Sequence, residues 1–192
     1  MVIPTYKRPD LLFRLLTSIS RQTLLPDEVI VVDDASGMDK QYNDCITEFE
    51  TKLLNLRLHR LPVNAGAPHA RNVGISLSKS DWIALVDDDD EWLPEKLHQQ
   101  WEIAKEASPN LGLIYTWTEA RGSSTSASYV SDHLVRGDAR RHILNTNFIM
   151  SASVLVKKQA LLKAGLFDEM FPSCQDWDMW TRIFLLDYTC DV

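Results

Sequence analysis

Apolar residues along this chain follow two alternating patterns. Continuous apolar runs at residues 2–4, 28–32 and 82–86 are typical of strands buried inside a parallel sheet. Between these runs, leucine and isoleucine recur at helical spacing, as they do after Pro9. The alternation predicts strand–helix units packed around one sheet.

The same patterns extend along the rest of the chain. Strands are predicted at residues 2–4, 28–32, 56–62, 82–86, 113–117 and 153–156. Helices are predicted after Pro9, across the inward-facing positions 42–53, around 71–74, and at 94–107, 157–164 and 175–186. The strand at 56–62 alternates apolar and charged residues, which favours the edge of the sheet. Residues 119–147 lose the pattern, and the polar, turn-forming segment 121–128 within them indicates a mobile loop or an irregular hairpin.

These elements predict an α/β fold with a doubly wound, mostly parallel sheet and helices on both faces. Right-handed crossovers place the C-terminal end of every strand on one edge, where ligands bind in such sheets. The side chains expected at that edge are Thr5, Tyr6, Asp33, Asp34 and residues 87–90. Their convergence from several strands predicts a binding site there.

Composition limits the possible functions. The 192 residues, 45% of them hydrophobic, fit one globular domain over residues 1–192, and the short first strand suggests a domain cut from a longer polypeptide. A net charge of −7 argues against a nucleic-acid partner. The three cysteines show no metal-type spacing, and no apolar run reaches the roughly 18 residues of a membrane span. We therefore expect reduced thiols and a cytoplasmic location.

Five consecutive carboxylates, residues 87–91, follow the apolar run at 82–86. Neighbouring charges about 4 Å apart repel by roughly 1 kcal/mol in water and about 4 kcal/mol near a protein surface. A hard divalent cation with oxygen ligands is the usual compensation. The alternative is a solvated acidic loop before a helix begun by Pro94, because the N-terminal end of a helix attracts carboxylates.

No glycine-rich phosphate loop is present, since neither G-x-G-x-x-G nor G-x-x-x-x-G-K-[ST] occurs. An Asp-x-Asp arrangement can hold a diphosphate through a bridging cation instead, and residues 87–89 provide one. Asp34 would then accept a hydrogen bond from a base with an N–H edge, such as uracil, thymine or guanine. The alternative for Asp34 is the N-cap of the following helix, a role open to Ser36 as well.

Other polar residues are candidates for single roles. Arg71 is either a contact to ribose or phosphate or an exposed helical arginine, and Tyr6 either covers the base or packs. Asp176 is the candidate general base, because the apolar bulk of Trp177 beside it would raise its proton affinity. The alternatives are an acidic residue favoured by the first turn of the last helix and, as the base, Asp178.

Five motifs stand in order along the chain. They are Ile3-Pro4-Thr5-Tyr6-Lys7-Arg8; Val31-Val32-Asp33-Asp34-Ala35-Ser36; Asn64-Ala65-Gly66 with Ala70-Arg71-Asn72-Val73-Gly74; Leu85-Val86-Asp87-Asp88-Asp89-Asp90 with Trp92, Pro94, Lys96 and Leu97; and Gly165-Leu166-Phe167-Asp168 with Gln175-Asp176-Trp177-Asp178. Together they resemble the inverting family 2 glycosyltransferases over nearly the whole chain.

The resemblance implies a GT-A fold, a nucleotide-diphosphate sugar donor, commonly a UDP-sugar, and Mg²⁺ or Mn²⁺ as cofactor. Residues 1–110 would form the nucleotide-sugar half, and residues 111–192 the acceptor and catalytic half. The acceptor would be a saccharide or a lipid-linked saccharide, as in cell-surface polysaccharide biosynthesis, with peripheral membrane contact through segments beyond this chain.

The resemblance also implies roles for individual residues. The expected nucleotide contacts are Pro4, Thr5, Tyr6, Asp34, Arg71 and Asp88. Asp34 would accept from the base and Asp88 would lie near the ribose. Asp89, with Asp87, would hold the metal and the diphosphate. Asp176 would deprotonate the acceptor hydroxyl for in-line attack on the anomeric carbon.

Two departures from the family pattern leave other functions open. Gln175 stands where the family has glutamate, and the chain ends at Val192, before the segments that usually help to bind acceptor or membrane. A non-catalytic or truncated sugar-nucleotide-binding module is therefore one alternative. A signalling receiver domain is another, because paired carboxylates after an apolar strand also suit phosphorylation on aspartate with Mg²⁺. We expect the Ser-rich segment 121–131 to select the acceptor, because loops over a fixed scaffold often do so.

Overall fold

The computed structural model describes residues 1–121 and 128–192 of the chain. The strands are β1 Val2–Thr5, β2 Val29–Asp33, β3 Leu56–Arg60, β4 Trp82–Ala84, β5 Leu111–Ile114, β6 Thr118–Arg121, β7 Ser128–Ser131, β8 Leu155–Lys157 and β9 Thr189–Asp191. The α-helices are α1 Pro9–Ile19, α2 Asp39–Phe49, α3 Ala67–Leu77, α4 Lys96–Lys105, α5 Arg140–Ile143, α6 Lys158–Lys163 and α7 Gln175–Leu185. A 3-10 helix, η1, covers Ser151–Ser153.

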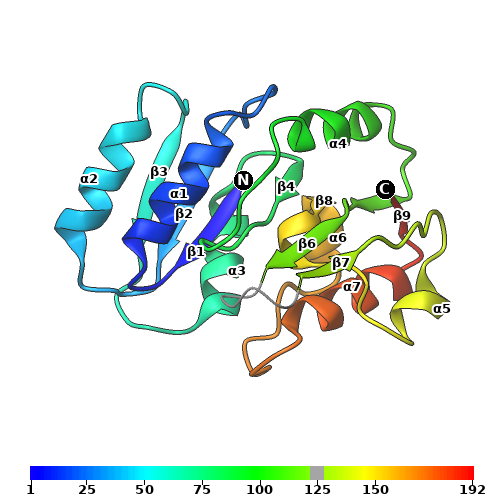
Figure 1. The fold of residues 1–192 in the computed structure, drawn as a ribbon. Helices are drawn as coiled ribbons and strands as arrows, with labels where there is room; N and C mark the ends of the chain where they lie inside the picture. Colours follow the sequence, from blue (N-terminus) through cyan, green and yellow to red (C-terminus); the bar gives the residue numbers. More distant parts are fainter. Residues whose placement is uncertain (122–127) are drawn as a thin grey trace.

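Two runs of strands meet side by side at the centre of the molecule (Figure 1). One run has the order β1-β2-β3 and is parallel throughout, with β3 at its edge as predicted. The other has the order β4-β8-β5-β9, and a parallel bridge from Val2 to Leu85 joins the two runs. The strand β8 is antiparallel to both of its neighbours. The prediction that every strand ends on the same edge is therefore wrong for β8, although the mostly parallel sheet is confirmed.

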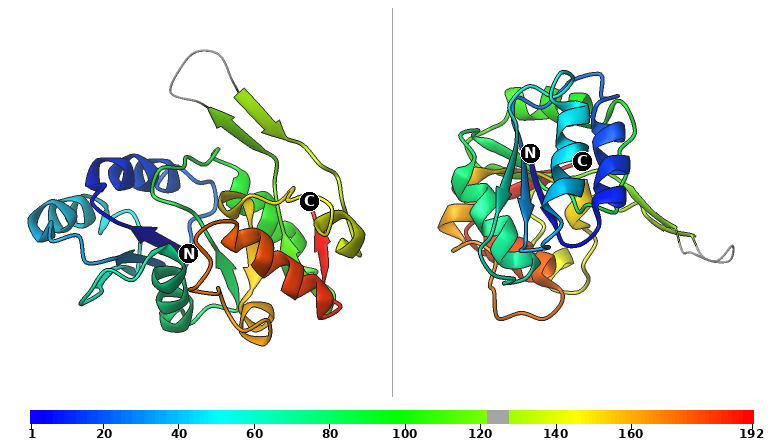
Figure 2. Two further views of the ribbon diagram at one scale, coloured as in Figure 1. Left: turned by 90° about the horizontal axis from the view of Figure 1, so that it is seen from below. Right: turned by 90° about the vertical axis from the view of Figure 1, so that its left-hand side faces the viewer.

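Helices cover both faces of these strands (Figure 2). In β2, Val29 and Val31 pack in one core with residues of α1, α2 and α4. The alternate residues Ile30 and Val32 pack on the opposite face with Ala70 of α3. A third core on that second face collects residues of α3, α5, α6 and α7. The predicted doubly wound architecture is thus confirmed, because continuous apolar strands need cover on both sides.

The helix α3 lies unusually close to β1. A Cβ atom added to Gly74 would lie 2.3 Å from Cγ1 of Val2, so this helix position accepts no side chain without a shift. Arg71 precedes Gly74 by one turn on the same helix. The close packing therefore fixes Arg71 beside the end of β1.

Several predicted boundaries are displaced. The ladder of β4 ends at Ala84 rather than 86, β5 begins two residues before the predicted 113, and α4 begins at Lys96 rather than Pro94. The sequence reading missed β9 altogether.

An antiparallel hairpin of β6 and β7 projects from the body of the molecule (Figure 2), which confirms the hairpin alternative for its two strands. Residues 122–127, the centre of the segment predicted to be mobile and to select the acceptor, lie outside the described residues. Among the helices that the structure describes, none combines the length and apolar character needed to cross a bilayer.

Candidate functional site

A cavity of about 230 Å³ opens where β1 and β2 end and where the chain leaves β4. Its lining residues are Pro4, Thr5, Tyr6, Arg8, Asp34, Ala67, Ala70, Arg71, Asp87 and Asp89. Seven of them were predicted to bind the nucleotide or the metal: Pro4, Thr5, Tyr6, Asp34, Arg71, Asp87 and Asp89. Asp88 and Asp176, which were also predicted to act here, do not line the cavity.

Asp34 lies buried directly after β2 and fixes the turn into α3. Its two carboxylate oxygens accept hydrogen bonds from the backbone N–H groups of Ala65 and Gly66, each at 2.8 Å. The helix α2 begins after Met38 without a side-chain cap, so the N-cap alternative is wrong for both Asp34 and Ser36. A carboxylate has about four lone-pair directions. Two backbone donors therefore leave Asp34 able to accept another hydrogen bond from the cavity.

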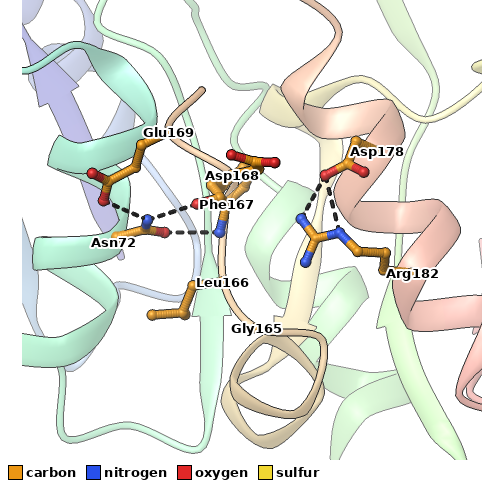
Figure 3. Close-up of a pocket in the computed structure, with 8 residues that line it drawn as sticks. All are labelled: Asn72, Gly165, Leu166, Phe167, Asp168, Glu169, Asp178 and Arg182. Atoms are coloured by element: carbon orange, nitrogen blue, oxygen red, sulfur yellow. Dashed lines mark hydrogen bonds and ion pairs between the residues drawn. The ribbon is translucent and has the colours of Figure 1, made fainter. Parts of the chain in front are cut away.

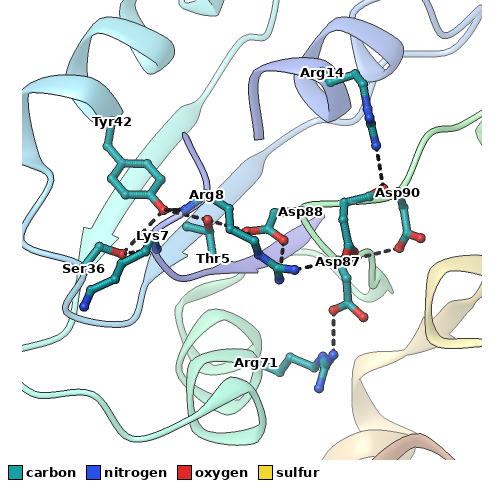
Figure 4. A network of polar contacts seen from close by, with 11 residues as sticks. Thr5, Lys7, Arg8, Arg14, Ser36, Tyr42, Arg71, Asp87, Asp88 and Asp90 are labelled. Carbon is teal, nitrogen blue, oxygen red and sulfur yellow. Dashed lines mark hydrogen bonds and ion pairs between the residues drawn. The ribbon is translucent and has the colours of Figure 1, made fainter. Parts of the chain in front are cut away.

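Arg71 reaches from α3 across the cavity and is only 7% exposed (Figure 4). Its Nη2 atom donates to Oδ1 of Asp87 at 2.6 Å, and its Nη1 atom donates to Oε1 of Gln175 at 3.1 Å. The Nε–H group is buried and has no acceptor within the part of the chain that the structure describes. The alternative of an exposed helical arginine is wrong. A buried donor without a partner is costly, so the arrangement favours an anionic ligand at this point.

Arg8, directly before α1, bridges two carboxylates of the acidic run (Figure 4). Its Nε atom donates to Oδ2 of Asp88 at 3.2 Å, and its Nη1 atom donates to Oδ2 of Asp89 at 3.0 Å. Its Nη2 atom lies 2.6 Å from Oδ1 of Asp88, an ion pair whose angles do not meet those of a hydrogen bond. Sequence reasoning assigned Arg8 no role beyond the family motif.

Asp88 is fully buried beneath this bridge. It also accepts a hydrogen bond from the hydroxyl of Thr5 at 2.7 Å. Burial, the strongest influence, raises the pKa of Asp88, and the Thr5 hydroxyl and Arg8 oppose that rise. A direct contact between Asp88 and a ribose would require this packing to open, so the burial of Asp88 speaks against the expected contact.

Asp90 stabilises the turn formed by the acidic run. Its Oδ2 atom accepts a hydrogen bond from the backbone N–H of Asp87 at 3.0 Å. Burial, followed by the charge of Asp87, raises the pKa of Asp90 to about 7. Near neutral pH, Asp90 is therefore partly protonated, which lowers the repulsion among its neighbours.

Asp87 and Asp89 are the two carboxylates of the run that face the cavity. The described residues contain no group of three or more His, Cys, Asp or Glu side chains arranged to hold a metal ion. Mg²⁺ is usually bound by one or two carboxylates together with water and substrate phosphates. Two hard oxygen donors beside a cavity therefore fit a divalent cation that is shared with a diphosphate, rather than a cation caged by protein alone.

The two candidate bases at the start of α7 differ in their partners. Asp178 forms an ion pair with Arg182 at 2.5 Å. Asp176 accepts hydrogen bonds from Nδ2 of Asn147 at 3.2 Å and from the N–H of Trp177 at 2.8 Å, and within the described chain it forms no ion pair. This difference favours Asp176 as the proton acceptor. Its neighbour Gln175 binds Arg71, which links α7 to the cavity.

The backbone is strained at three positions that border these residues. Lys7, Ala35 and Cys174 have φ angles of 56°, 59° and 57°, in the left-handed region that side chains other than glycine rarely occupy. Lys7 follows Tyr6, Ala35 follows Asp34, and Cys174 precedes Gln175. Such strain persists only where the surrounding contacts impose it, and it is often found at functional sites.

A second, larger cavity of about 590 Å³ lies between α3, the loop after α6 and α7 (Figure 3). Asp178 and Arg182 form one wall, and Asn72 on the other side bonds to the backbone of Phe167 and to Glu169. These polar groups satisfy one another. The carboxylate of Asp178 therefore lines this second cavity as the partner of Arg182, and Asp178 is not among the residues that line the first cavity.

Sequence reasoning also missed Tyr42 and Asn147. The hydroxyl of Tyr42 lies 2.9 Å from Oγ1 of Thr5 and accepts a hydrogen bond from the N–H of Arg8 at 3.1 Å. Tyr42 was predicted only as an inward-facing residue of its helix, and Asn147 lies in a segment without periodicity. The contact of Arg8 with the acidic run could have been predicted from the sequence, because crowded carboxylates need nearby cations and Arg8 follows a strand that ends at the same edge.

Comparison with known proteins agrees with this geometry. The family model described as glycosyl transferase family 2 matches residues 1–165. The chain belongs to glycosyl transferase family 2. An uncharacterized glycosyltransferase of Haemophilus influenzae is 29% identical over 189 residues, which is 95% of this chain and 60% of that protein. The uncharacterized glycosyltransferase YwdF of Bacillus subtilis is 30% identical over 190 residues, which is 95% of this chain and 66% of YwdF.

Solved structures of glycosyltransferases share the fold. The chain aligns with S. aureus TarS at a TM-score of 0.76 and 22% identity, covering 98% of this chain and 56% of that one. It also aligns with the mannosyltransferase PcManGT of Pyrobaculum calidifontis, solved with GDP-Man and Mn²⁺, at a TM-score of 0.73 and 21% identity. That alignment covers 100% of this chain and 53% of PcManGT. The predicted GT-A fold is thereby confirmed. This family 2 chain spans 60–66% of the length of the two curated relatives above.

Proposed function

We propose that this domain transfers a sugar from a nucleotide-diphosphate donor, a UDP-sugar, to an acceptor hydroxyl with inversion and with the help of a divalent cation. One observation carries the proposal. Asp34, Arg71, and the pair Asp87 and Asp89 come from three separate segments of the chain, and all of them line one cavity.

The donor's base and diphosphate would occupy different parts of this cavity. Asp34 retains lone pairs for the N–H edge of a base. Uracil and guanine both have that edge, and TarS and PcManGT were solved with UDP-GlcNAc and GDP-Man respectively. The ring of Tyr6 is 39% exposed beside Pro4 and Thr5 and is our candidate to cover the base. A further contact from Asp88 to the ribose is not part of this proposal, and we assign Asp88 to positioning Thr5 and Arg8.

The diphosphate would lie between Arg71 and the two carboxylates that line the cavity, Asp87 and Asp89. Arg71 offers a guanidinium that matches phosphate oxygens, and among the described residues its Nε–H group has no acceptor. Asp89 and Asp87 would hold the cation, which when bound supplies Lewis-acid stabilisation of the leaving diphosphate.

Asp176 would accept the proton of the acceptor hydroxyl as that oxygen attacks the anomeric carbon. Asn147 and the N–H of Trp177 hold its carboxylate in one orientation. Gln175, where the family has glutamate, keeps a hydrogen bond to Arg71 without adding a negative charge next to the base.

A panel of donors tests the proposal. We expect a UDP-sugar to raise the melting temperature only when Mn²⁺ is present, and we expect the same donor to release UDP in the presence of acceptor saccharides. Donor binding without turnover would support the non-catalytic module instead. No stabilisation by any UDP-sugar or GDP-sugar would contradict the proposed function.

A further inference from the structure

We propose that Arg8 is the counter-ion of Asp89 in the absence of ligands. When a diphosphate binds, the guanidinium of Arg8 pairs with the phosphate instead, and Asp89 becomes free to bind a divalent cation. The inference rests on the proposed function and adds a role for a residue outside the expected site. Arg8 would couple metal binding to nucleotide binding.

The two ends of the Arg8 bridge differ in strength. Asp88 is fully buried, and an uncompensated buried charge is strongly destabilising, so Arg8 is held firmly at that end. At the other end the side chains of Arg8 and Asp89 are 45% and 48% exposed. Ion pairs that exposed contribute about 0.2–1 kcal/mol, so the contact with Asp89 exchanges easily.

The base of the Arg8 side chain is fixed while its tip can change partner. The backbone N–H of Arg8 donates to Tyr42, and its carbonyl accepts from the N–H of Leu12 in the first turn of α1. Arg8 lines the cavity together with Arg71. If Asp89 turns to a cation, Nη1 of Arg8 remains beside the cavity, where a phosphate oxygen is a better acceptor than water.

The second arginine of the cavity is held differently. The side chains of Arg71 and Asp87 are 9% and 32% exposed, so their ion pair is the more protected of the two. The ion pair of Asp89 with Arg8 is therefore easier to break than that of Asp87 with Arg71, so a cation displaces the arginine from Asp89 at the lower free-energy cost. In the absence of nucleotide, Arg8 competes with the cation for Asp89; with a diphosphate bound, that competition ends, and the two ligands favour each other reciprocally.

The test measures Mn²⁺ binding by electron paramagnetic resonance of the free ion, with MnCl₂ alone and with saturating UDP or GDP. In Arg8→Ala we expect Mn²⁺ alone to bind about 1.5-fold to fivefold more tightly than in the unmodified chain, the gain that loss of an exposed ion pair allows. The factor by which the nucleotide tightens Mn²⁺ binding should shrink by a similar ratio. Arg8→Lys retains a charge for Asp88 without the bridging fork, and it carries the same prediction should Arg8→Ala fail to fold.

Arg14→Ala is the matched control. Arg14 pairs with Glu91 and donates to the carbonyl of Asp89, so its loss removes one positive charge near the run without freeing the Asp89 carboxylate. In Arg14→Ala we expect UDP or GDP to tighten Mn²⁺ binding by the same factor as in the unmodified chain. If Arg8 variants match the unmodified chain, or if Arg14→Ala reproduces their effect, the role of Arg8 is refuted while the proposed function stands. If the unmodified chain binds no Mn²⁺ with either nucleotide, both fail.

Discussion

The carboxylates of residues 87–91 are balanced chiefly by arginines from other parts of the chain. Arg71 pairs with Asp87, Arg8 with Asp88 and Asp89, and Arg14 with Glu91. The repulsion that led us to expect a cation is therefore already reduced within the protein. A metal at this site would have to compete with guanidinium groups, which is why we expect it to bind mainly together with a diphosphate.

The proposed role of Asp176 as the base can be tested by substitution. Asp176→Asn should leave the donor dissociation constant unchanged and lower the transfer rate by about 10²–10⁴-fold, because the amide cannot accept the acceptor's proton. Isothermal titration with donor and a transfer assay measure the two quantities.

Asp178→Asn is the comparison for that prediction. Its carboxylate pairs with Arg182, so this variant should keep most of the transfer rate. A large loss of rate in Asp178→Asn, with normal transfer by Asp176→Asn, would exchange the roles of the two aspartates.

Individual site residues were predictable to the extent that they follow strands. Asp34, Asp87 and Asp89 lie in the short acidic segments that follow apolar runs, so their place at this edge followed from the parallel sheet alone. The burial of Asp88 did not follow, because it depends on Thr5 and Arg8, which are about eighty residues away in the chain.

At the scale of elements, one glutamate joins the start of β2 to the turn between α3 and β4. Oε1 of Glu28 accepts from Oγ of Ser78 at 2.6 Å, from N–H of Lys79 at 2.7 Å and from both donors of Ser80. Its Oε2 atom pairs with Arg57 of β3 at 2.8 Å. Burial acts to raise the pKa of Glu28, but the hydrogen bonds from Ser78, Lys79 and Ser80 together outweigh it and lower the pKa to about 2.

This lowered pKa predicts acid sensitivity. The folded pKa lies below the ordinary value of 4.5, so the stabilisation is complete above about pH 5 and is lost as the pH falls toward 2. Glu28→Gln should therefore lower the free energy of unfolding by about 2–3 kcal/mol at pH 7 and by far less near pH 2. Urea unfolding as a function of pH measures both. Glu48→Gln, at an exposed position of α2, should change neither, and an equal loss at both pH values in Glu28→Gln would contradict this account.

Some elements were beyond a pattern-based prediction for physical reasons. The strand β9 has three residues with one buried apolar side chain, Cys190, and it exists because it pairs with β5. The direction of β8 depends on how the chain returns from η1, which periodicity does not record. Long amphipathic helices such as α1 were predictable because one local face of each is apolar.

At the scale of the molecule, the site joins the two halves of the chain. Residues 1–110 supply the whole cavity lining, while residues 111–192 supply Asp176 and Gln175. Side chains of α3 connect the halves at this point: Arg71 contacts Gln175, Asn72 contacts Phe167 and Glu169, and His69 contacts Glu169. These contacts hold the start of α7, which carries the proposed base Asp176, against the helix that carries Arg71.

The proposed function depends most on Asp89 binding a cation that it shares with the donor's diphosphate. Titration calorimetry of UDP into the unmodified chain and into Asp89→Asn, each with and without Mn²⁺, tests it most directly. We predict that Mn²⁺ tightens UDP binding at least about tenfold in the unmodified chain, equal to about 1.4 kcal/mol, and has almost no effect in Asp89→Asn. Equal enhancement by Mn²⁺ in both proteins would contradict the claim.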